Sequence, residues 1–311
     1  MNKETTVLLI GGSGFLGTAL TRRLKRDGYG VHHLVREPVA SQEAGVTVHA
    51  GGLGNVELLR RLLPECGVVF HLASGTTPTI SAKDPSLEAE LNIFPTLRFL
   101  EVLHNFPQTK LIYISSGGTV YGNPGDQAVT ENTPLASLSY YGAGKIATEV
   151  FLLTYKHTFK RAVSILRPSN LYGPEQPLLQ NFGIVRTMLQ RCLDDQPIDI
   201  WGDGEVVRDF LYLDDLVEAC MQVMQCNAPN DIYNIGAGKG HSLNQLANII
   251  KVICNKPLDI RYSSSRSIDV KRIVLDCHRI QTDLGWKPMV TLENGIRRTW
   301  NWLLAPTRGT K

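Results

Sequence analysis

The strongest constraint on this chain is a short apolar run that leads directly into a cluster of glycines near residue 10. Val7–Ile10 has the composition of a buried strand, GGSGFLG follows over residues 11–17, and the amphipathic segment Thr18–Leu24 comes next. In the order strand, turn, helix, Gly11 permits the tight turn, Gly14 lets backbone approach a pyrophosphate, and Gly17 lets helix and strand pack closely. The helix N-terminus adds unpaired N–H groups and the positive end of its dipole. The sequence therefore predicts a dinucleotide site here.

Apolar strand-like runs alternate with helix-period segments through the first 170 residues. The strands are expected at Val7–Ile10, Gly30–Leu34, Val46–His49, Val68–Leu72, Leu111–Ser115 and Val163–Leu166, and the helices at about 15–26, 55–63, 85–104 and 139–157. Continuous apolar strands that alternate with helices are typical of a parallel sheet covered on both faces. The pattern predicts a doubly wound α/β fold of the Rossmann type. Pro95 lies inside the segment 85–104, and we expect a break there because proline removes a helical hydrogen bond.

After about residue 170 the alternation stops, and short segments rich in proline and glycine follow. Further on, 214–226 and 242–254 have helical patterns and Ile232–Ile235 reads as a strand. We predict a dinucleotide-binding domain over 1–170, with 209–236 returning to it. Residues 171–208 and 237–311 are then expected to form a smaller C-terminal α/β lobe that binds the substrate.

Composition excludes several classes of protein. The 311 residues are 43% hydrophobic and 20% charged, with a formal charge of +3 and no basic run, so no nucleic-acid or membrane partner is predicted. The six cysteines lack metal-ligand or redox spacing, which fits reduced thiols and predicts no metal site. Neither a signal peptide nor an apolar run of membrane-spanning length is recognisable, so a cytoplasmic protein is expected.

A tyrosine and a lysine four residues apart form the candidate catalytic site. Tyr141 and Lys145 fall at the start of a predicted helix, which Ser137 or Ser139 can cap, and therefore share one helix face. A free phenol has a pKa near 10 and is a poor base at neutral pH. A lysine ammonium beside it, together with a positively charged nicotinamide ring, would stabilise the phenolate. An ordinary amphipathic helix with a surface lysine is the alternative, and the glycine loop upstream argues against it.

These motifs, in this order, resemble the extended short-chain dehydrogenase/reductases, and among them the NAD-dependent epimerase/dehydratase family in its UDP-glucose 4-epimerase-like branch. The resemblance covers nearly the whole chain. It rests on Gly11–Gly17, Phe70–Ala73, Asn92, Ser115–Gly122, Tyr141 with Lys145, Arg167–Pro174, Gly202–Gly204, Arg208–Phe210, Asp214-Asp215, Asn234–Gly236, Arg266 with Asp269, and Leu284-Gly285-Trp286 with Pro288.

The resemblance implies a set of roles. Tyr141 is expected to be the catalytic acid/base and Lys145 its electrostatic partner. The cofactor, NAD, is expected to contact Gly11, Ser13, Gly14, Phe15, Leu16, Gly17, Arg36, Leu53, Leu72, Ala73, Asn92, Tyr141 and Lys145. Asn170, Arg208, Arg266 and Asp269 are expected to bind a nucleotide-diphosphate sugar, the arginines because a forked guanidinium suits phosphate oxygens. An ion pair of Arg208 with Asp209 is the alternative for that arginine. A homodimer through the helices near 85–104 and 139–157 is also implied.

The chain departs from the family at three positions. Gly117 stands where a serine or threonine usually bonds the reacting hydroxyl, so Ser116 or Thr119 is the expected substitute. The second strand ends in Val35-Arg36 instead of the acidic residue that grips the ribose of NAD, so Arg36 either packs on adenine with NAD or meets the 2′-phosphate of NADP. Gly52 replaces an aspartate that commonly meets the adenine amine.

Two enzymatic hypotheses follow, with a third from another class. The first is a nucleotide-sugar 4-epimerase that oxidises C4 transiently with bound NAD, Tyr141 taking the proton of the 4-hydroxyl. The second is an NADPH-dependent reductase of a 4-keto-6-deoxy nucleotide sugar, which Val35-Arg36 favours. A 4,6-dehydratase is disfavoured because Gly118-Thr119 replaces its usual Asp-Glu pair. A non-enzymatic cofactor sensor would explain Gly117. Retention of Tyr141, Lys145 and both arginines argues against it, because a sensor of the cofactor alone has no need of a sugar-diphosphate site.

Overall fold

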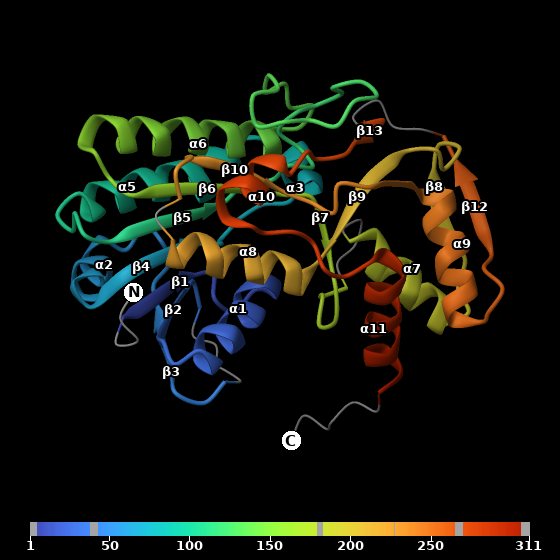
Figure 1. Ribbon diagram of the computed structural model, residues 1–311, viewed down its shortest axis with the longest axis horizontal. Helices are drawn as coiled ribbons and strands as arrows, with labels where there is room; N and C mark the ends of the chain where they lie inside the picture. The colour runs from blue at the N-terminus through green and yellow to red at the C-terminus, as the bar shows by residue number, and fades with distance from the viewer. Residues whose placement is uncertain (1–4, 38–42, 179–182, 227, 265–269, 306–311) are drawn as a thin grey trace.

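A computed structural model of the chain describes residues 5–37, 43–178, 183–226, 228–264 and 270–305. Its centre is a parallel sheet of seven strands in the order β10-β6-β5-β4-β1-β2-β3 (Figure 1). The strands are β1 (Thr6–Ile10), β2 (Gly30–Val35), β3 (Val46–Ala50), β4 (Cys66–His71), β5 (Lys110–Ile114), β6 (Val163–Pro168) and β10 (Ile232–Ile235). Strand β1 lies between β2 and β4, and the chain order runs outward from it in opposite directions. In sheets of this kind, ligands bind outside the carboxyl ends of the strands at the point of reversal.

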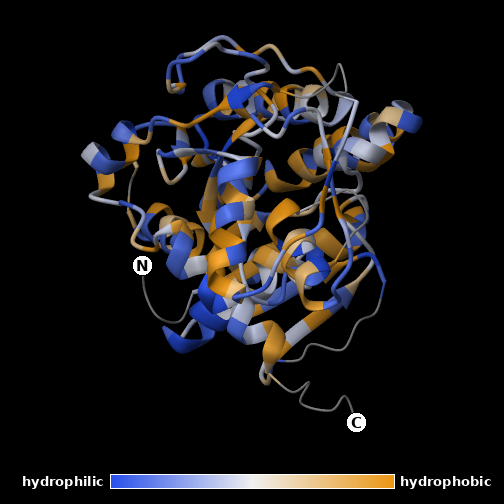
Figure 2. Cartoon of the chain, turned by 90° about the vertical axis from the view of Figure 1, so that its right-hand side faces the viewer, coloured by the Kyte–Doolittle hydropathy of each residue, from blue (hydrophilic) through white to orange (hydrophobic). Residues whose placement is uncertain are grey.

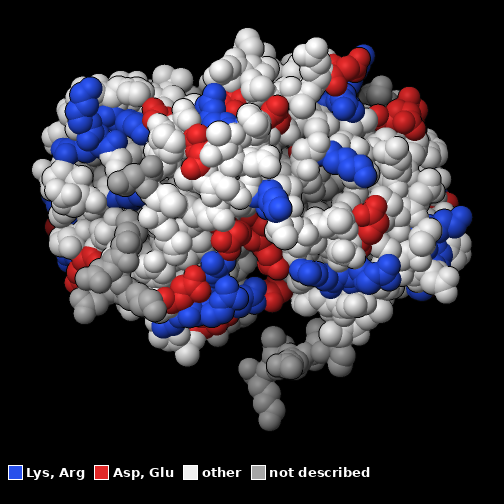
Figure 3. Space-filling model, in the orientation of Figure 1, with Lys and Arg blue, Asp and Glu red and all other residues white. Residues whose placement is uncertain are grey.

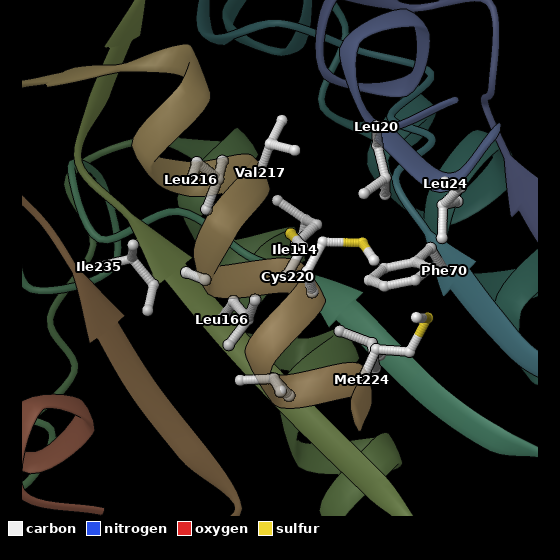
Figure 4. Close-up of a cluster of buried hydrophobic side chains, with 14 of the residues drawn as sticks. Leu20, Leu24, Phe70, Ile114, Leu166, Leu216, Val217, Cys220, Met224 and Ile235 are labelled. Carbon is white, nitrogen blue, oxygen red and sulfur yellow. The ribbon is translucent and has the colours of Figure 1, made fainter. Parts of the chain in front are cut away.

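Helices cover both faces of this sheet, as the continuous apolar strands predict. On one face lie α1 (Phe15–Arg26), α8 (Leu213–Gln225) and α10 (His278–Leu284), and on the other lie α2 (Val56–Leu62), α5 (Phe94–Leu103) and α6 (Tyr140–Phe159). Figure 4 shows the first interface, where Cys220 and Met224 of α8 lie near Phe70 of β4. Figure 2 shows helices that carry both hydrophobic and hydrophilic residues, as expected of helices with one buried side. The predicted doubly wound α/β fold is confirmed.

A third hydrophobic core holds the smaller lobe together. It lies among α7 (Ile184–Leu193), α9 (Leu243–Cys254) and α11 (Leu292–Leu304), and it includes Phe210 and Tyr212. The strands of this lobe are β7 (Asn170–Tyr172), β8 (Ile198–Trp201), β9 (Val207–Tyr212), β11 (Gly240–Ser242), β12 (Ile260–Ser263) and β13 (Arg272–Ile273). Strand β9 pairs with β7, β11 and β13, while β8 pairs with β12.

The two parts of the molecule are interleaved along the chain. Helix α8 packs on the large sheet and strand β10 belongs to it, whereas β9, which contains residues 209–212, belongs to the smaller lobe's sheet. In the other direction, Ile280 of α10 and Trp286 join the core of the large sheet. The chain therefore crosses between the lobes before α8 and again after β10.

The segment 85–104 is interrupted, as Pro95 predicts. It consists of α4 (Ser86–Glu88), a π-helical turn η2 (Ala89–Ile93) and α5, with Pro95 in the first turn of α5. Two short helices precede it, η1 (Leu63–Glu65) and α3 (Pro78–Lys83). Within the described residues, no helix is both long and apolar enough to span a bilayer.

Candidate functional site

Several glycines of the loop between β1 and α1 stand where a side chain would clash with neighbouring atoms. Gly11 has φ +86°, and a Cβ there would lie 2.9 Å from the backbone nitrogen of Ala73. A Cβ on Gly17 would lie 2.5 Å from the carbonyl oxygen of Gly12. Gly14 caps α1 without any side-chain hydrogen bond, so the first-turn N–H groups stay open to an anion. These features fit the pyrophosphate of a dinucleotide.

A buried histidine supports this loop from below. A Cβ on Gly12 would lie 2.4 Å from the ring of His33, and His33 Nε2 is 2.7 Å from the hydroxyl of Thr21. Because Thr21 donates its proton to the carbonyl of Gly17, the histidine nitrogen donates to Thr21. Burial lowers the pKa of His33, which keeps the ring neutral under the anion site.

The other predicted cofactor residues follow β2 and β4 at the same edge of the sheet. The Leu72 N–H donates to the carbonyl of Ile10 at 3.0 Å, which places Leu72 and Ala73 beside the glycine loop. Arg36 is exposed, and a Cβ on Gly52 would lie 3.6 Å from its Cγ. Leu53, the next residue, is buried.

Tyr141 and Lys145 lie in the first two turns of α6, which Ser139 caps by accepting the N–H of Gly142 at 3.1 Å. The Lys145 ammonium donates to the carbonyl of Ile114 at 3.0 Å. Its nitrogen is 5.7 Å from the centre of the Tyr141 ring and 4.9 Å from that of Tyr113. The ammonium is therefore anchored at the carboxyl end of β5, with the phenol beside it.

Burial controls the charge of both groups. It raises the pKa of Tyr141 to about 12, and the negative charge of Glu88 acts in the same direction. It lowers the pKa of Lys145 to about 8, against the opposing effect of Glu88 and Glu149. In the protein alone the phenol therefore stays protonated at neutral pH, and a further positive charge is needed before Tyr141 can act as a base.

Glu88, which the sequence analysis missed, lies in a buried polar cluster with Asn92. The hydroxyl of Thr76 donates to Glu88 Oε1, and the Asn92 amide donates to Glu88 Oε2 at 2.9 Å and to Thr76 at 3.1 Å. The amide oxygen of Asn92 accepts the N–H of Gly75 at 2.7 Å. Both N–H bonds of Asn92, a predicted cofactor contact, are thus directed at protein atoms. The i, i+4 spacing of Glu88 and Asn92 was the available sequence signal.

A second missed carboxylate, Glu149, lies one turn after Lys145 in α6 and forms a buried ion pair with Arg167. Arg167 holds it through both ends of the guanidinium, with Nε 3.0 Å from Oε1, and the hydroxyl of Ser115 also donates to it. Arg167 donates further to Tyr121, whose hydroxyl donates to Asn234 at 2.6 Å. This network joins α6 to β6 and β10.

Gly117 has no room for the hydroxyl that the family usually carries there. A Cβ at this position would lie 2.8 Å from the carbonyl oxygen of Arg167 and 2.6 Å from Leu275. Of the two expected substitutes, both partly buried, Thr119 lies next to the start of α6: a Cβ on Gly142 would be 2.8 Å from its carbonyl oxygen. The Thr119 hydroxyl is 3.5 Å from the carbonyl of Ser116.

Two of the four predicted substrate residues, Asn170 and Arg208, lie on strands of the smaller lobe. Asn170 begins β7, and its Oδ1 would be 2.9 Å from a Cβ on Gly118. Arg208 lies in β9 and donates to the carbonyl of Val207 at 3.0 Å. The Asp209 carboxylate instead accepts backbone N–H groups from Ala237, Gly238 and Leu275, which identifies a structural role for it. Arg266 and Asp269 lie outside the described residues.

Several known proteins are similar to this chain over nearly their whole length. A putative UDP-glucose 4-epimerase of Methanocaldococcus jannaschii is 32% identical over 96% of this chain and 98% of its own. A dTDP-4-dehydro-6-deoxyglucose reductase of Escherichia coli is 31% identical, with 94% and 96% covered. The solved UDP-glucose 4-epimerase of Thermotoga maritima with UDP-glucose superposes with a TM-score of 0.91 at 30% identity, with 96% and 98% covered. That of Thermus thermophilus, in complex with NAD, gives 0.89 at 29%, with 97% and 100% covered.

Residues 7–236, from β1 and the glycine loop to the end of β10, match the sequence profile described as the NAD dependent epimerase/dehydratase family. The expectations of an enzyme and of this family are confirmed. This chain belongs to the NAD-dependent epimerase/dehydratase family.

Proposed function

We propose that this enzyme is a nucleotide-sugar 4-epimerase that works with a retained NAD. The observation that carries the proposal is the placement of Tyr141 and Lys145 at the same sheet edge as an open, glycine-lined helix N-terminus. That placement brings an acid/base beside a dinucleotide site. The UDP-glucose 4-epimerases among its relatives support this activity and make a UDP-hexose the first substrate to test.

The chain's own residues supply the proton chemistry. When bound, NAD supplies the acceptor and donor for the hydride of C4. Tyr141, as phenolate, takes the proton of the sugar 4-hydroxyl as C4 is oxidised. It returns the proton after the 4-keto sugar has rotated in the site to present its other face. Lys145 stabilises that phenolate. Thr119, or Ser116, takes the place of the hydroxyl missing at Gly117.

The smaller lobe is proposed to hold the rest of the substrate, as the division of the chain suggests. Asn170 of β7 and Arg208 of β9, together with Arg266, are the proposed ligands of the diphosphate. Asp269 is proposed to contact the nucleoside. The segments 171–208 and 237–311 contribute most of this lobe.

Reduction of a 4-keto-6-deoxy nucleotide sugar by NADPH is the second candidate. The observation that favours it is Arg36, an exposed cation directly after β2 and beside Gly52, where a 2′-phosphate would lie. The reductase among the relatives supports this alternative. In that case the cofactor exchanges in every cycle.

We further propose that two copies associate through α5, η2 and α6. Apolar side chains on these adjoining segments face outward, including Leu91, Phe94, Val150 and Phe151, with Phe94 60% exposed. A face of this kind is typical of a protein interface. A cytoplasmic location is proposed from the six cysteines, all of which are free thiols.

The first experiment identifies the cofactor. Freshly purified protein is denatured, and any released dinucleotide is identified by mass spectrometry; the same preparation is then incubated with UDP-glucose without added cofactor. Stoichiometric NAD together with formation of UDP-galactose supports the epimerase. An empty site, or NADP with turnover only of a 4-keto sugar plus NADPH, rejects the epimerase in favour of the reductase.

Substitution of the phenol tests the catalytic assignment. Tyr141→Phe is expected to lower turnover by about 10²–10⁴-fold, the range for loss of a general acid/base, without loss of the circular dichroism spectrum or of bound dinucleotide. Tyr140→Phe is the matched control, because Tyr140 precedes it in α6 and is 55% exposed. Unchanged turnover in Tyr141→Phe would refute the assignment.

A further inference from the structure

Glu88 is a buried carboxylate next to the candidate catalytic pair, and the chemistry proposed above does not use it. Only 6% of its surface is exposed. Its two oxygens accept hydrogen bonds from uncharged donors, the hydroxyl of Thr76 and the amide of Asn92. Among the ion pairs of the described residues, none involves Glu88.

A missing side chain on α6 allows this carboxylate to approach. A Cβ on Gly144 would lie 2.5 Å from Glu88 Oε2. Gly144 is one turn beyond Tyr141 and immediately before Lys145, so the carboxylate lies against the turn that presents both. Glu88, Asn92, Gly144 and Lys145 also line one small cavity, with room for about one water molecule. Close approach of the Glu88 carboxylate therefore explains why residue 144 is a glycine.

The titratable groups around Lys145 come from five elements. Glu88 approaches from α4, His71 from the end of β4, Tyr113 from β5 and Glu149 from α6 itself. Arg167 of β6 neutralises Glu149 through paired hydrogen bonds. His71 is neutral, because burial lowers its pKa to about 3. Glu88 is therefore the carboxylate around this pair whose charge is not balanced by a hydrogen-bonded cation of the described residues.

We propose that Glu88 is a positioning residue that holds Tyr141 protonated and Lys145 charged until the positive ring of an oxidised cofactor binds. A negative charge beside the phenol opposes loss of its proton, and beside the ammonium it favours retention of the charge. The positive ring supplies the opposing charge, so ionisation of Tyr141 is coupled to occupancy by the oxidised cofactor. This inference rests on the proposed dinucleotide chemistry and adds to it a control of when the base forms.

Ionisation of Tyr141 can be measured without turnover. The purified protein, saturated with NAD⁺ and free of substrate, is titrated with pH while phenolate absorbance is recorded, and the same titration of Tyr141→Phe identifies the signal. Glu88→Gln is expected to lower the midpoint by about one pH unit, the scale of a nearby charge. Glu88→Asp, which keeps the charge, is expected to lower it by less than half as much.

A second variant keeps the inference testable if Glu88→Gln does not fold. Thr76→Val removes a hydrogen-bond donor from the Glu88 carboxylate, which concentrates its negative charge, so the midpoint is expected to rise. No shift in Glu88→Gln, an equal shift in Glu88→Asp, or a fall in Thr76→Val would overturn the inference. The expected shifts in a protein that turns over no nucleotide sugar would support the role of Glu88 and reject the proposed function instead.

Discussion

Glu88 and Glu149 are both buried carboxylates that favour the charged form of Lys145, but their surroundings differ. Glu149 is bound by both ends of the Arg167 guanidinium and by Ser115, in a network that continues to Tyr121. Glu88 is bound by a hydroxyl and an amide, both of which leave its net charge in place. The first arrangement is a neutral unit that joins α6 to β6, while the second is a net negative charge next to the reacting groups.

The difference shows how similar burial leads to different roles. A buried ion pair adds little to net stability, but removal of one partner is costly because it strands the other charge. A buried charge without a cation acts on the protonation of its neighbours instead. The Glu149 region should therefore respond to substitution mainly in stability, and the Glu88 region mainly in protonation.

The largest expected effect is on stability, from loss of the guanidinium that neutralises Glu149. Arg167→Met leaves a buried carboxylate unpaired and is expected to lower the free energy of unfolding by about 3–5 kcal/mol, measured by urea denaturation. The control is Arg98→Met, which breaks an ion pair with Glu101 whose side chains are 65% and 62% exposed, and which is expected to cost about 0–1 kcal/mol. Equal losses in the two variants would remove the distinction between the regions.

The sequence predicted those parts of the molecule that local pattern determines. The strand–glycine–helix order at Val7–Leu24 encodes its own turn, and the apolar runs mark the strands of the large sheet to within two residues. Tyr141 and Lys145 were recognisable because their spacing is local. The pairing of distant strands was not recognisable from the sequence. Strand β9 pairs with β7, β11 and β13, and tertiary packing determines these partners.

The unpredicted part of the site depends on contacts between distant segments. Glu88 reads as a solvated helix residue until Thr76, Asn92 and Gly144 are brought around it. The absent hydroxyl at Gly117 was visible in the sequence, but its cause was not. That cause is the carbonyl of Arg167, fifty residues further along the chain, which occupies the space of a side chain.

A smaller effect is expected on the pH dependence of stability, from His71, which lines the same cavity as Glu88. Burial lowers the pKa of His71 from 6.5 to about 3, so below pH 6.5 the unfolded chain binds a proton that the folded protein does not. The contribution of neutral His71 to the free energy of unfolding is therefore fully present above pH 6.5, and it is lost as the pH falls toward 3. Between pH 6.5 and 5 this loss is about 2 kcal/mol.

The substitution His71→Gln should remove that contribution while keeping a donor for Thr96, which His71 Nε2 contacts at 3.0 Å. The gap in unfolding free energy between wild type and variant should then shrink on acidification, as followed by urea denaturation at each pH. Arg167 should add no such dependence: burial opposes its charge, but hydrogen bonds and charge attraction, mainly to Glu149, together raise its pKa above the usual value. A gap that widens toward pH 5 would contradict the assignment.

The smallest expected effect comes from filling the space through which Glu88 approaches α6. Gly144→Ala places a methyl group 2.5 Å from Glu88 Oε2, and the carboxylate must move because the helix backbone cannot. Overpacking of this kind costs about 1–3 kcal/mol, here toward the lower end because the displaced atom ends a flexible side chain. Gly54→Ala is the control: no atom lies within 4 Å of the added methyl, so it should be neutral or slightly stabilising. A carboxylate displaced from the helix turn that carries Tyr141 and Lys145 should act less on the phenol, so Gly144→Ala should also lower the phenolate midpoint, by less than Glu88→Gln does. A loss of stability with an unchanged midpoint would mean that Gly144 matters for packing only. The displaced Glu88 carboxylate would then influence the phenol as strongly from its new position as from its original one.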